Sequence, residues 1–261
     1  MILSSSNPKV KYVRRLQNDR QFRNRERAYV IEGTRWFTEI GRQALVPHMV
    51  FFTEQWADLP GHSDILLQIG VPGQAVSEAV MQEMSDTSTP PGILAVLPIQ
   101  ERPFPTPLTF LLILDAIQTP GNLGTMLRTA AAAGVDGVAL APGCVDPYNP
   151  KVVRGSMGAL LRLPVHQLDW DEIGTLTNGM DVWVADVTGE KSYTAVSWSR
   201  PTALIIGSEA HGAGPQARRL ATGSITIHMD HDTESLNAAV AAAIVLFEAK
   251  RQRDDDKMKR L

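Results

Sequence analysis

Asn122 and Arg128 place an amide and a guanidinium six residues apart in the stretch Asp115-Ala-Ile-Gln-Thr-Pro-Gly-Asn122-Leu-Gly-Thr-Met-Leu-Arg128. An amide can orient a neighbouring side chain or a ligand, because it both donates and accepts hydrogen bonds. A guanidinium keeps its charge and stabilises negative charge that develops on a reacting oxygen. This pair therefore suits a site for an anionic ligand, provided that the fold holds both residues at a crevice.

The residues around Asn122 predict a strand followed by a helix. Thr109 to Ile113 are apolar, Pro120-Gly121 breaks the run, and Asn122 through Ala133 predicts an Ala-rich helix that ends at Gly134. In open α/β sheets, ligands bind beyond the carboxyl ends of strands, where helix N-termini present free N–H groups. We therefore expect Asn122 near a helix start and Arg128 about two turns further along.

Two later segments complete a set of three motifs. They are Ala203-Leu-Ile-Ile-Gly207-Ser-Glu209-Ala-His-Gly212 and Ile225-Thr-Ile227-His-Met229-Asp-His-Asp-Thr-Glu-Ser235-Leu236-Asn237. With Asn122 and Arg128, they resemble the motifs of the SpoU (TrmH) family of RNA ribose 2′-O-methyltransferases: an Asn and an Arg at this spacing, Gly-x-Glu-x-x-Gly, and Ser-Leu-Asn at a helix start. The resemblance covers about Leu108 to Arg253, and the joint order of three motifs makes it specific.

The resemblance implies S-adenosylmethionine as the methyl donor and an RNA ribose 2′-hydroxyl as the acceptor. It implies five catalytic residues, in which Arg128 is assisted by Asn122, Glu209, Ser235 and Asn237. It implies five cofactor-binding residues: Gly207, Gly212, Ile227, Met229 and Leu236. Gly207 would admit a close backbone approach that a side chain would block.

Several of these residues also have structural interpretations. Ile227 and Leu236 could simply pack in the core, Glu209 could be a surface carboxylate, and Ser235 could be the N-cap of the following helix. Arg128 is more plausible as an electrostatic stabiliser than as a base, because a guanidinium is almost never deprotonated in proteins; a transiently neutral Arg128 acting as the base stays open as the alternative.

The third motif departs from the family pattern Ile-Pro-Met-x-Gly. Here His231 stands where the family has glycine, which puts the shape of the cofactor loop in question. His228, Asp230, His231 and Asp232 resemble a metal cluster in composition, but adjacent positions rarely converge on one ion, so we expect no metal site.

Composition indicates an ordinary globular protein. The chain has 261 residues, of which 44% are hydrophobic, and Cys144 is the single cysteine. One cysteine excludes an intrachain disulfide and a cysteine-based zinc site, and a small buried residue is the favoured interpretation of Cys144 over a catalytic thiol. No run approaches a membrane span and the start lacks the order of a signal peptide, so we expect a cytoplasmic protein.

The formal charge of −3 hides a basic N-terminal segment. Between Met1 and Arg35, nine basic residues oppose three acidic ones, a difference of 9 − 3 = +6. Such a segment suits an RNA-facing surface, although a solvated helix face is equally consistent with it. The candidate RNA contacts are Arg14, Arg15, Arg23, Arg25 and Arg35, together with Arg154 and Ser156 from a stretch that resembles a fourth family segment.

The Pro-rich stretch 99–107 predicts a linker between an N-terminal domain at 1–98 and a catalytic domain at 108–261. In the first domain we expect strands at 28–33, 49–53 and 93–97 and a helix at 34–41; the segment resembles the L30e-like substrate-binding domain of SpoU enzymes. In the second we expect an α/β fold with a mostly parallel sheet and helices on both faces, from strands near 109–114, 137–141, 181–186, 203–207 and 225–229. The resemblance further implies a C-terminal trefoil knot.

The sequence is also consistent with two rival functions. Gly212-Ala-Gly214-Pro-Gln-Ala217 fits a dinucleotide fingerprint, but no following βαβ unit supports it. A non-catalytic, ribosome-associated RNA-binding protein is the second rival. Among RNA substrates, ribosomal RNA is favoured over transfer RNA by the N-terminal domain. The helix from Ser235 to about Phe247 is apolar on nearly every side, which predicts a homodimer interface. Burial of this helix against the N-terminal domain of the same chain is the alternative.

Overall fold

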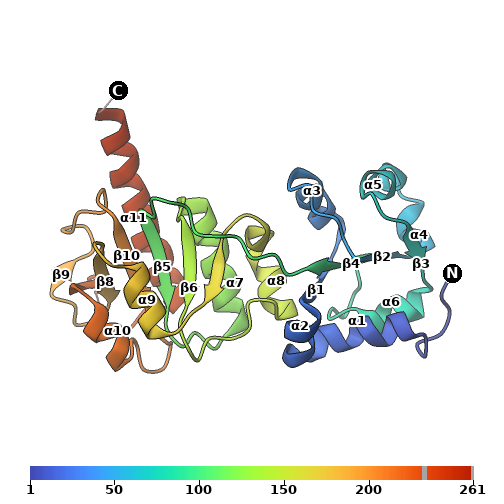
Figure 1. Cartoon of the computed structure of the whole chain (residues 1–261), viewed down its shortest axis with the longest axis horizontal. Coiled ribbons are helices and arrows are strands. Elements are labelled where there is room, and N and C mark those ends of the chain that lie inside the picture. The colour runs from blue at the N-terminus through green and yellow to red at the C-terminus, as the bar shows by residue number, and fades with distance from the viewer. Residues whose placement is uncertain (231–233, 260–261) are drawn as a thin grey trace. The chain divides into compact units, whose positions relative to one another are not determined.

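The computed structural model describes residues 1–230 and 234–259, which form two compact units (Figure 1). The first unit consists of Met1–Gln100 and Tyr148–Leu161, and the second of Glu101–Pro147 and Arg162–Leu261. The linear division expected from the Pro-rich stretch leaves 148–161 in the second domain, whereas this segment packs within the first unit.

The first unit is built on a four-stranded sheet with the order β1-β4-β2-β3. Its strands are β1 (Ala28–Glu32), β2 (Met49–Phe52), β3 (Gly73–Ala75) and β4 (Ile93–Pro98). β4 pairs antiparallel with β1 and β2, and β3 pairs parallel with β2. Its helices are α1 (Pro8–Asn18), α2 (Arg20–Glu26), α3 (Thr34–Arg42), α4 (Glu54–Ala57), α5 (His62–Gln68), α6 (Glu78–Met84) and α8 (Pro150–Ser156), with the 3-10 turn η1 (Ala159–Leu161). The three expected strands and the expected helix are confirmed.

Helix α1 shows why the basic N-terminal segment folds. Asn7 caps it by accepting from the Lys9 backbone N–H, and Pro8 occupies its first turn. Val10, Val13 and Leu16 recur at helical spacing and are fully buried in the core of the unit. The basic residues therefore occupy the other faces of an amphipathic helix.

The second unit has a seven-stranded sheet with the order β7-β6-β5-β10-β8-β11-β9, and every pairing is parallel. Its strands are β5 (Phe110–Leu114), β6 (Gly137–Leu140), β7 (Val165–Gln167), β8 (Asp181–Ala185), β9 (Lys191–Ser192), β10 (Thr202–Ile206) and β11 (Gly223–Thr226). The five expected strands and the α/β fold class are confirmed. β5, β6 and β10 are buried along their whole length, as a parallel sheet covered on both faces requires.

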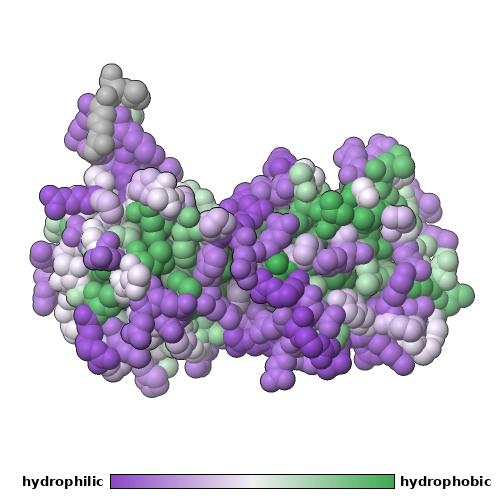
Figure 2. Space-filling view, in the orientation of Figure 1, coloured by the Kyte–Doolittle hydropathy of each residue, from purple (hydrophilic) through white to green (hydrophobic). Residues whose placement is uncertain are grey.

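Four helices accompany this sheet among the described residues: α7 (Pro120–Ala133), α9 (Trp170–Leu176), α10 (Pro215–Leu220) and α11 (Ala238–Lys259). α11 packs against α7, and its buried residues lie between Ala239 and Ala249. It continues to Lys259, past the apolar stretch that ends near Phe247, and its last turns carry ion pairs such as Lys250–Asp254 at 2.9 Å and Arg251–Asp255 at 2.7 Å. Figure 2 shows these last turns as a hydrophilic surface. None of the helices in the described ranges combines the length and the apolar character needed to cross a membrane.

The register of β5 and β10 determines where the first two motifs meet. The strands are parallel neighbours, with Leu114 opposite Ile206 at their carboxyl ends. β6 lies on the other side of β5, and β8 lies on the other side of β10. The chain therefore runs from β5 towards one edge of the sheet and from β10 towards the other edge. In open α/β sheets such a switch point opens the crevice that binds ligands.

Candidate active site

Asn122 lies in the first turn of α7, directly beyond β5. Thr119 is the N-cap residue of α7 but makes no side-chain cap hydrogen bond, and Pro120 follows it. The helix ends at Gly134, whose φ of 77° lies in the left-handed region. The expected helix and its terminator are therefore confirmed.

Asn122 joins the three motifs through one chain of hydrogen bonds. Its Nδ2 donates to Oε1 of Glu209 at 2.7 Å, and its Oδ1 accepts from Nδ2 of Asn237 at 3.2 Å. Because the carboxylate can only accept and the Asn237 amide nitrogen can only donate, both ends of the Asn122 amide have a defined orientation. Segments that are 87 and 115 residues away in the sequence thus hold a single side chain.

Asn237 also fixes the start of α11. Its Oδ1 accepts from the backbone N–H groups of Ala239 at 2.9 Å and Val240 at 3.3 Å. The N-cap role that the sequence suggested for Ser235 is therefore wrong, because the helix begins three residues later and Asn237 supplies the cap. Ser235 instead lines the pocket described below.

Glu209 is ionised at the N-terminus of α7. Partial burial opposes ionisation of the Glu209 carboxylate, but hydrogen bonds outweigh this effect and hold the pKa of Glu209 below its usual value. The hydrogen bonds come from the Asn122 side chain, the backbone of Glu209 itself, the Thr119 side chain and the Gln118 backbone. The positive end of the helix dipole favours the same charge state. The anion at this helix start is thus supplied by the second motif.

A pocket of about 440 Å³ lies beside Glu209, at the carboxyl ends of β8, β10 and β11. Its walls include Glu209 and Ser235 and all five residues expected to bind a cofactor: Gly207, Gly212, Ile227, Met229 and Leu236. The sequence motifs thus converge on one cavity. Apolar side chains of Ile206, Ile225 and Val245 extend its lining.

The close approach at Gly207 comes from the protein itself. A Cβ atom on Gly207 would lie 2.1 Å from the Ala213 backbone nitrogen and 2.1 Å from the Gly212 carbonyl carbon. The expectation that this glycine makes room for a ligand is therefore incomplete: it first makes room for the returning loop 208–213, which is closed by hydrogen bonds between the backbones of Ser208 and Gly212. That loop forms one wall of the pocket.

Three charged residues that line the pocket were not anticipated: Asp186, Arg218 and Glu234. Asp186 follows β8, and Arg218 lies on α10; their side chains form an ion pair at 2.6 Å. An acidic residue at the carboxyl end of an expected strand was a usable signal for Asp186. Arg218 had no such signal, because only the tertiary fold brings α10 to the end of β8.

Arg128 lies six residues beyond Asn122 on α7, about 9 Å along the helix axis at 1.5 Å per residue. It is exposed, and it has no hydrogen bond or ion pair among residues 1–230 and 234–259. It is absent from the pocket lining. Its guanidinium is therefore available to a ligand outside the pocket.

No group of His, Cys, Asp or Glu side chains that could hold a metal occurs in the part of the chain that the structure describes. His231 and Asp232 lie outside the described residues, whereas His228 and Asp230 are exposed. Cys144 is buried, and burial raises the pKa of its thiol to about 11, which supports its interpretation as a structural residue. Gly214, from the dinucleotide-like stretch, donates its N–H to Asp115 at 2.7 Å and is the N-cap of a helix of only six residues.

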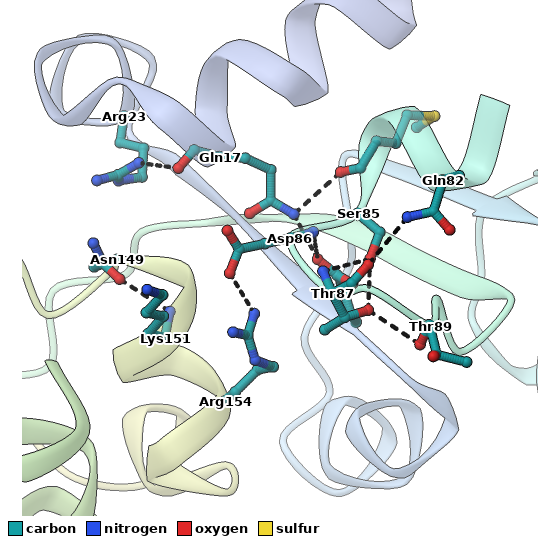
Figure 3. Close-up of polar contacts among 12 residues, drawn as sticks. Gln17, Arg23, Gln82, Ser85, Asp86, Thr87, Thr89, Asn149, Lys151 and Arg154 are labelled. Carbon is teal, nitrogen blue, oxygen red and sulfur yellow. Dashed lines mark hydrogen bonds and ion pairs between the residues drawn. The ribbon is translucent and has the colours of Figure 1, made fainter. Parts of the chain in front are cut away.

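The five candidate RNA-binding arginines between Met1 and Arg35 fall into two groups. Arg23 is only 3% exposed and donates to the Leu16 and Gln17 carbonyl oxygens at 2.6 and 3.1 Å, so its inclusion among RNA contacts is a correction: it stabilises the α1–α2 junction (Figure 3). Four others lie at the surface or in surface ion pairs: Arg14 with Glu83, Arg15 with Asp19, Arg25 with Glu26, and Arg35.

Arg154 and Ser156 lie on α8 of the first unit. Arg154 is half-buried and pairs with Asp86 at 2.7 Å (Figure 3). Ser156 is fully buried and donates to the Val153 carbonyl oxygen at 2.8 Å, within its own helix. The expected RNA contact of Ser156 is therefore wrong, because its hydroxyl does not reach the surface.

Comparisons with known proteins agree with this site. The SpoU rRNA Methylase family matches residues 109–247, and the MRM3-like substrate binding domain matches residues 7–95. A Synechocystis protein named as an uncharacterized tRNA/rRNA methyltransferase is 35% identical, over 96% of this chain and 93% of its own. The Bacillus subtilis 23S rRNA (guanosine(2553)-2′-O)-methyltransferase RlmP is 33% identical, over 94% and 97%.

Solved structures share the whole fold. The SpoU methyltransferase AviRb from Streptomyces viridochromogenes, in complex with the cofactor AdoMet, superposes with a TM-score of 0.86 at 26% identity, covering 95% of this chain and 98% of its own. The expected family is thus confirmed on motifs, site geometry and overall fold. This chain belongs to the SpoU rRNA methylase family.

Proposed function

We propose that this chain transfers a methyl group from S-adenosylmethionine to a ribose 2′-hydroxyl of ribosomal RNA. The observation that carries the proposal is the hydrogen-bonded chain Asn237–Asn122–Glu209, which ends on a wall of the pocket. It brings one polar side chain from each of the three motifs to the place where methyl donor and RNA would meet. The Synechocystis relative is named as a tRNA/rRNA methyltransferase, and RlmP is named for 2′-O-methylation of 23S rRNA.

The pocket fits S-adenosylmethionine in size and chemistry. About 440 Å³ lies within the range of small-molecule sites, and mostly apolar walls with a few placed polar groups are typical of them. The carboxylates of Asp186, Glu209 and Glu234 suit a ligand with cationic groups. The bound sulfonium supplies an activated methyl carbon, and the chain's own residues orient the acceptor oxygen and manage its proton.

Glu209 and Asn122 act here as positioning residues. A carboxylate with a lowered pKa is a weak base, so Glu209 holds the Asn122 amide in place more readily than it removes a proton. Arg128, exposed and without an ion pair among the described residues, binds the reacting ribose or its adjacent phosphate and stabilises developing negative charge. Ser235 and Asn237 complete the orientation of this group.

The first unit binds the RNA substrate. The ion pairs of Arg14, Arg15 and Arg25 are exposed, and exposed pairs stabilise the fold by only about 0–1 kcal/mol, so phosphates can replace the carboxylates. Arg35 and Arg154, which line one pocket of the same unit, would add further contacts with the RNA. The match to a substrate binding domain of an rRNA methyltransferase type favours ribosomal over transfer RNA. The cytoplasm is the compartment that follows from the likeness to RlmP, which is a bacterial enzyme named for this reaction.

Two copies of this chain form a homodimer through α11. Val240 and Phe247 on α11 are each 48% exposed, although Ala239, Ala242 and Val245 of the same helix are buried and the helix packs on α7. A second copy would cover these apolar side chains. Such a dimer would also allow the RNA-binding unit of one subunit to present substrate to the other.

The direct test is turnover of ribosomal RNA with isotope-labelled S-adenosylmethionine. After nuclease digestion, the label should reside in 2′-O-methylated nucleosides, and the modified linkage should resist alkaline hydrolysis because it lacks the free 2′-hydroxyl. Mapping by mass spectrometry then identifies the nucleotide. Label found in base-methylated nucleosides alone would refute the assignment.

A further inference from the structure

Arg218 projects from α10 into the wall of the pocket. It is the one arginine or lysine among the described residues that line the pocket, where the other charged side chains include Asp186, Glu209 and Glu234. Its side chain retains 50% of its exposure, whereas that of Asp186 retains 10%. A lone guanidinium in a mostly acidic and apolar pocket is the natural partner of an anionic group on a ligand.

The guanidinium is fixed before any ligand arrives. One terminal nitrogen, Nη2, pairs with Oδ2 of Asp186 at 2.6 Å, and Nε donates to the Ala213 carbonyl oxygen at 3.0 Å. Asp186 is in turn held by the backbone N–H and the hydroxyl of Thr188, both at 2.9 Å. These hydrogen bonds and the Arg218 side chain hold the pKa of Asp186 below its usual value. The arginine therefore has a persistent anionic anchor.

The anchored guanidinium of Arg218 has N–H donors that these two contacts do not use. Arginine has five N–H donors in one plane, and the two contacts above use two of them. The remaining donors form a fork of the kind that binds a carboxylate in a bidentate manner. Its position is preset, so little side-chain entropy is lost when a ligand is bound.

We propose that Arg218 binds the carboxylate of the methionine part of S-adenosylmethionine, and thereby makes the pocket selective for a cofactor with an intact amino-acid group. The inference rests on the proposed function, since it assigns a residue to that cofactor. Asp186 and the Ala213 carbonyl oxygen set the plane of the guanidinium. The acidic side chains of the pocket would then contact the cationic groups of the ligand.

Binding of two ligands that differ only in the carboxylate tests this assignment. Calorimetric Kd values for S-adenosylmethionine and for decarboxylated S-adenosylmethionine are measured without RNA. The wild-type protein should prefer the intact cofactor by on the order of 10- to 100-fold, the range expected for a charge-assisted hydrogen-bonded pair. In Arg218→Gln the two Kd values should become nearly equal, chiefly because the affinity for the intact cofactor falls.

Arg219→Gln is the matched control. Arg219 is the next residue on α10, is exposed and does not line the pocket, so its loss changes the net charge equally and should leave the preference intact. Arg218→Lys is the second variant if Arg218→Gln does not fold, as judged by its circular dichroism spectrum. It should lose most of the preference, because an ammonium cannot contact Asp186, Ala213 and a carboxylate in one plane.

Three results would overturn the inference. An unchanged preference in Arg218→Gln, an equal weakening of both ligands, or the same loss in Arg219→Gln would each show that Arg218 does not recognise the carboxylate. Failure of the wild-type protein to bind either ligand would be a different result, because it would remove the proposed cofactor and this inference with it.

Discussion

The Asn122 amide donates a 2.7 Å hydrogen bond to the Glu209 carboxylate, although 87 residues separate the two in the sequence. Because β5 and β10 are parallel neighbours, the segments that leave their carboxyl ends emerge side by side. Glu209 thereby supplies a hydrogen-bond acceptor at the N-terminus of α7. Asn122 connects this carboxylate to Asn237 at the start of α11.

Asn122→Ala should lower kcat by on the order of 10-fold or more and leave the Kd for S-adenosylmethionine nearly unchanged, since Asn122 positions other side chains and does not line the pocket. Single-turnover kinetics and calorimetry measure the two quantities. Thr125→Ala is a control on the exposed surface of the same helix. A large loss of cofactor affinity with intact turnover would contradict the positioning role.

Arg128→Ala should abolish methyl transfer with little change in thermal stability, because the side chain is exposed and packs in no core. Arg128→Lys should restore little activity, since a point-charge ammonium does not reproduce the planar fork. Initial rates with saturating cofactor and a melting curve for each variant test both statements. Near-normal rates in the lysine variant would rule out the proposed geometry.

Glu209 should give the protein an acid-sensitive component of stability. Its folded pKa lies below the ordinary value of 4.5, so the ionised form is favoured by folding; this stabilisation is present above about 4.5 and is lost as the pH falls through the folded pKa. The difference in melting temperature between wild type and Glu209→Gln should therefore be constant from pH 6 to 8. It should shrink on acidification towards pH 3. A difference that grows under acid would contradict the assigned ionisation state.

The surface arginines of the first unit should act through phosphate contacts. Replacing Arg14, Arg15 and Arg25 together with Gln should weaken RNA binding and reduce the slope of log K against log salt by up to about 0.7–0.9 for each lost phosphate contact. The same substitution at Arg42, which pairs with Glu39, is the control on a different helix. An unchanged slope would identify the basic segment as a solvated helix face.

Deleting the chain before Pro107 is a poorer test of whether the first unit binds RNA. The segment 148–161 belongs to the first unit, where α8 packs on β1 and the Tyr148 ring lies 4.9 Å from that of Tyr29. Truncation would remove these partners and expose the segment, so point substitutions separate RNA affinity from folding more cleanly.

Phe247→Glu should convert the proposed homodimer into a monomer near 28.5 kDa, because it places a charge among the apolar side chains of α11 that remain exposed. Sedimentation velocity at low micromolar concentration measures the change. Leu67→Glu is the control: Leu67 is 82% exposed on α5 of the first unit, and its replacement should leave the oligomeric state alone. A wild-type protein that sediments as an active monomer would refute the dimer.

Local sequence patterns determined many of the strands and helices of this protein. Apolar runs, Pro120-Gly121 and Gly134 predicted β5 and α7, and three ordered motifs indicated the family and its cofactor. Such features are readable because strand and helix signals, and the glycine that ends a helix, depend on residues close in sequence. The convergence of the motif residues on one pocket was expected from the resemblance, and their individual roles stay predictions.

Tertiary structure decided the rest, since burial and partnership depend on residues far apart in the chain. Charge alone could not separate Arg23, which is buried against two carbonyl oxygens, from the exposed Arg25 beside it on α2. Nor could it show that Ser156 is buried, that 148–161 joins the first unit, or that Asp186 and Arg218 meet at the pocket. A sequence records which groups a side chain offers; only the packed fold determines which of them are already satisfied and which remain for a ligand.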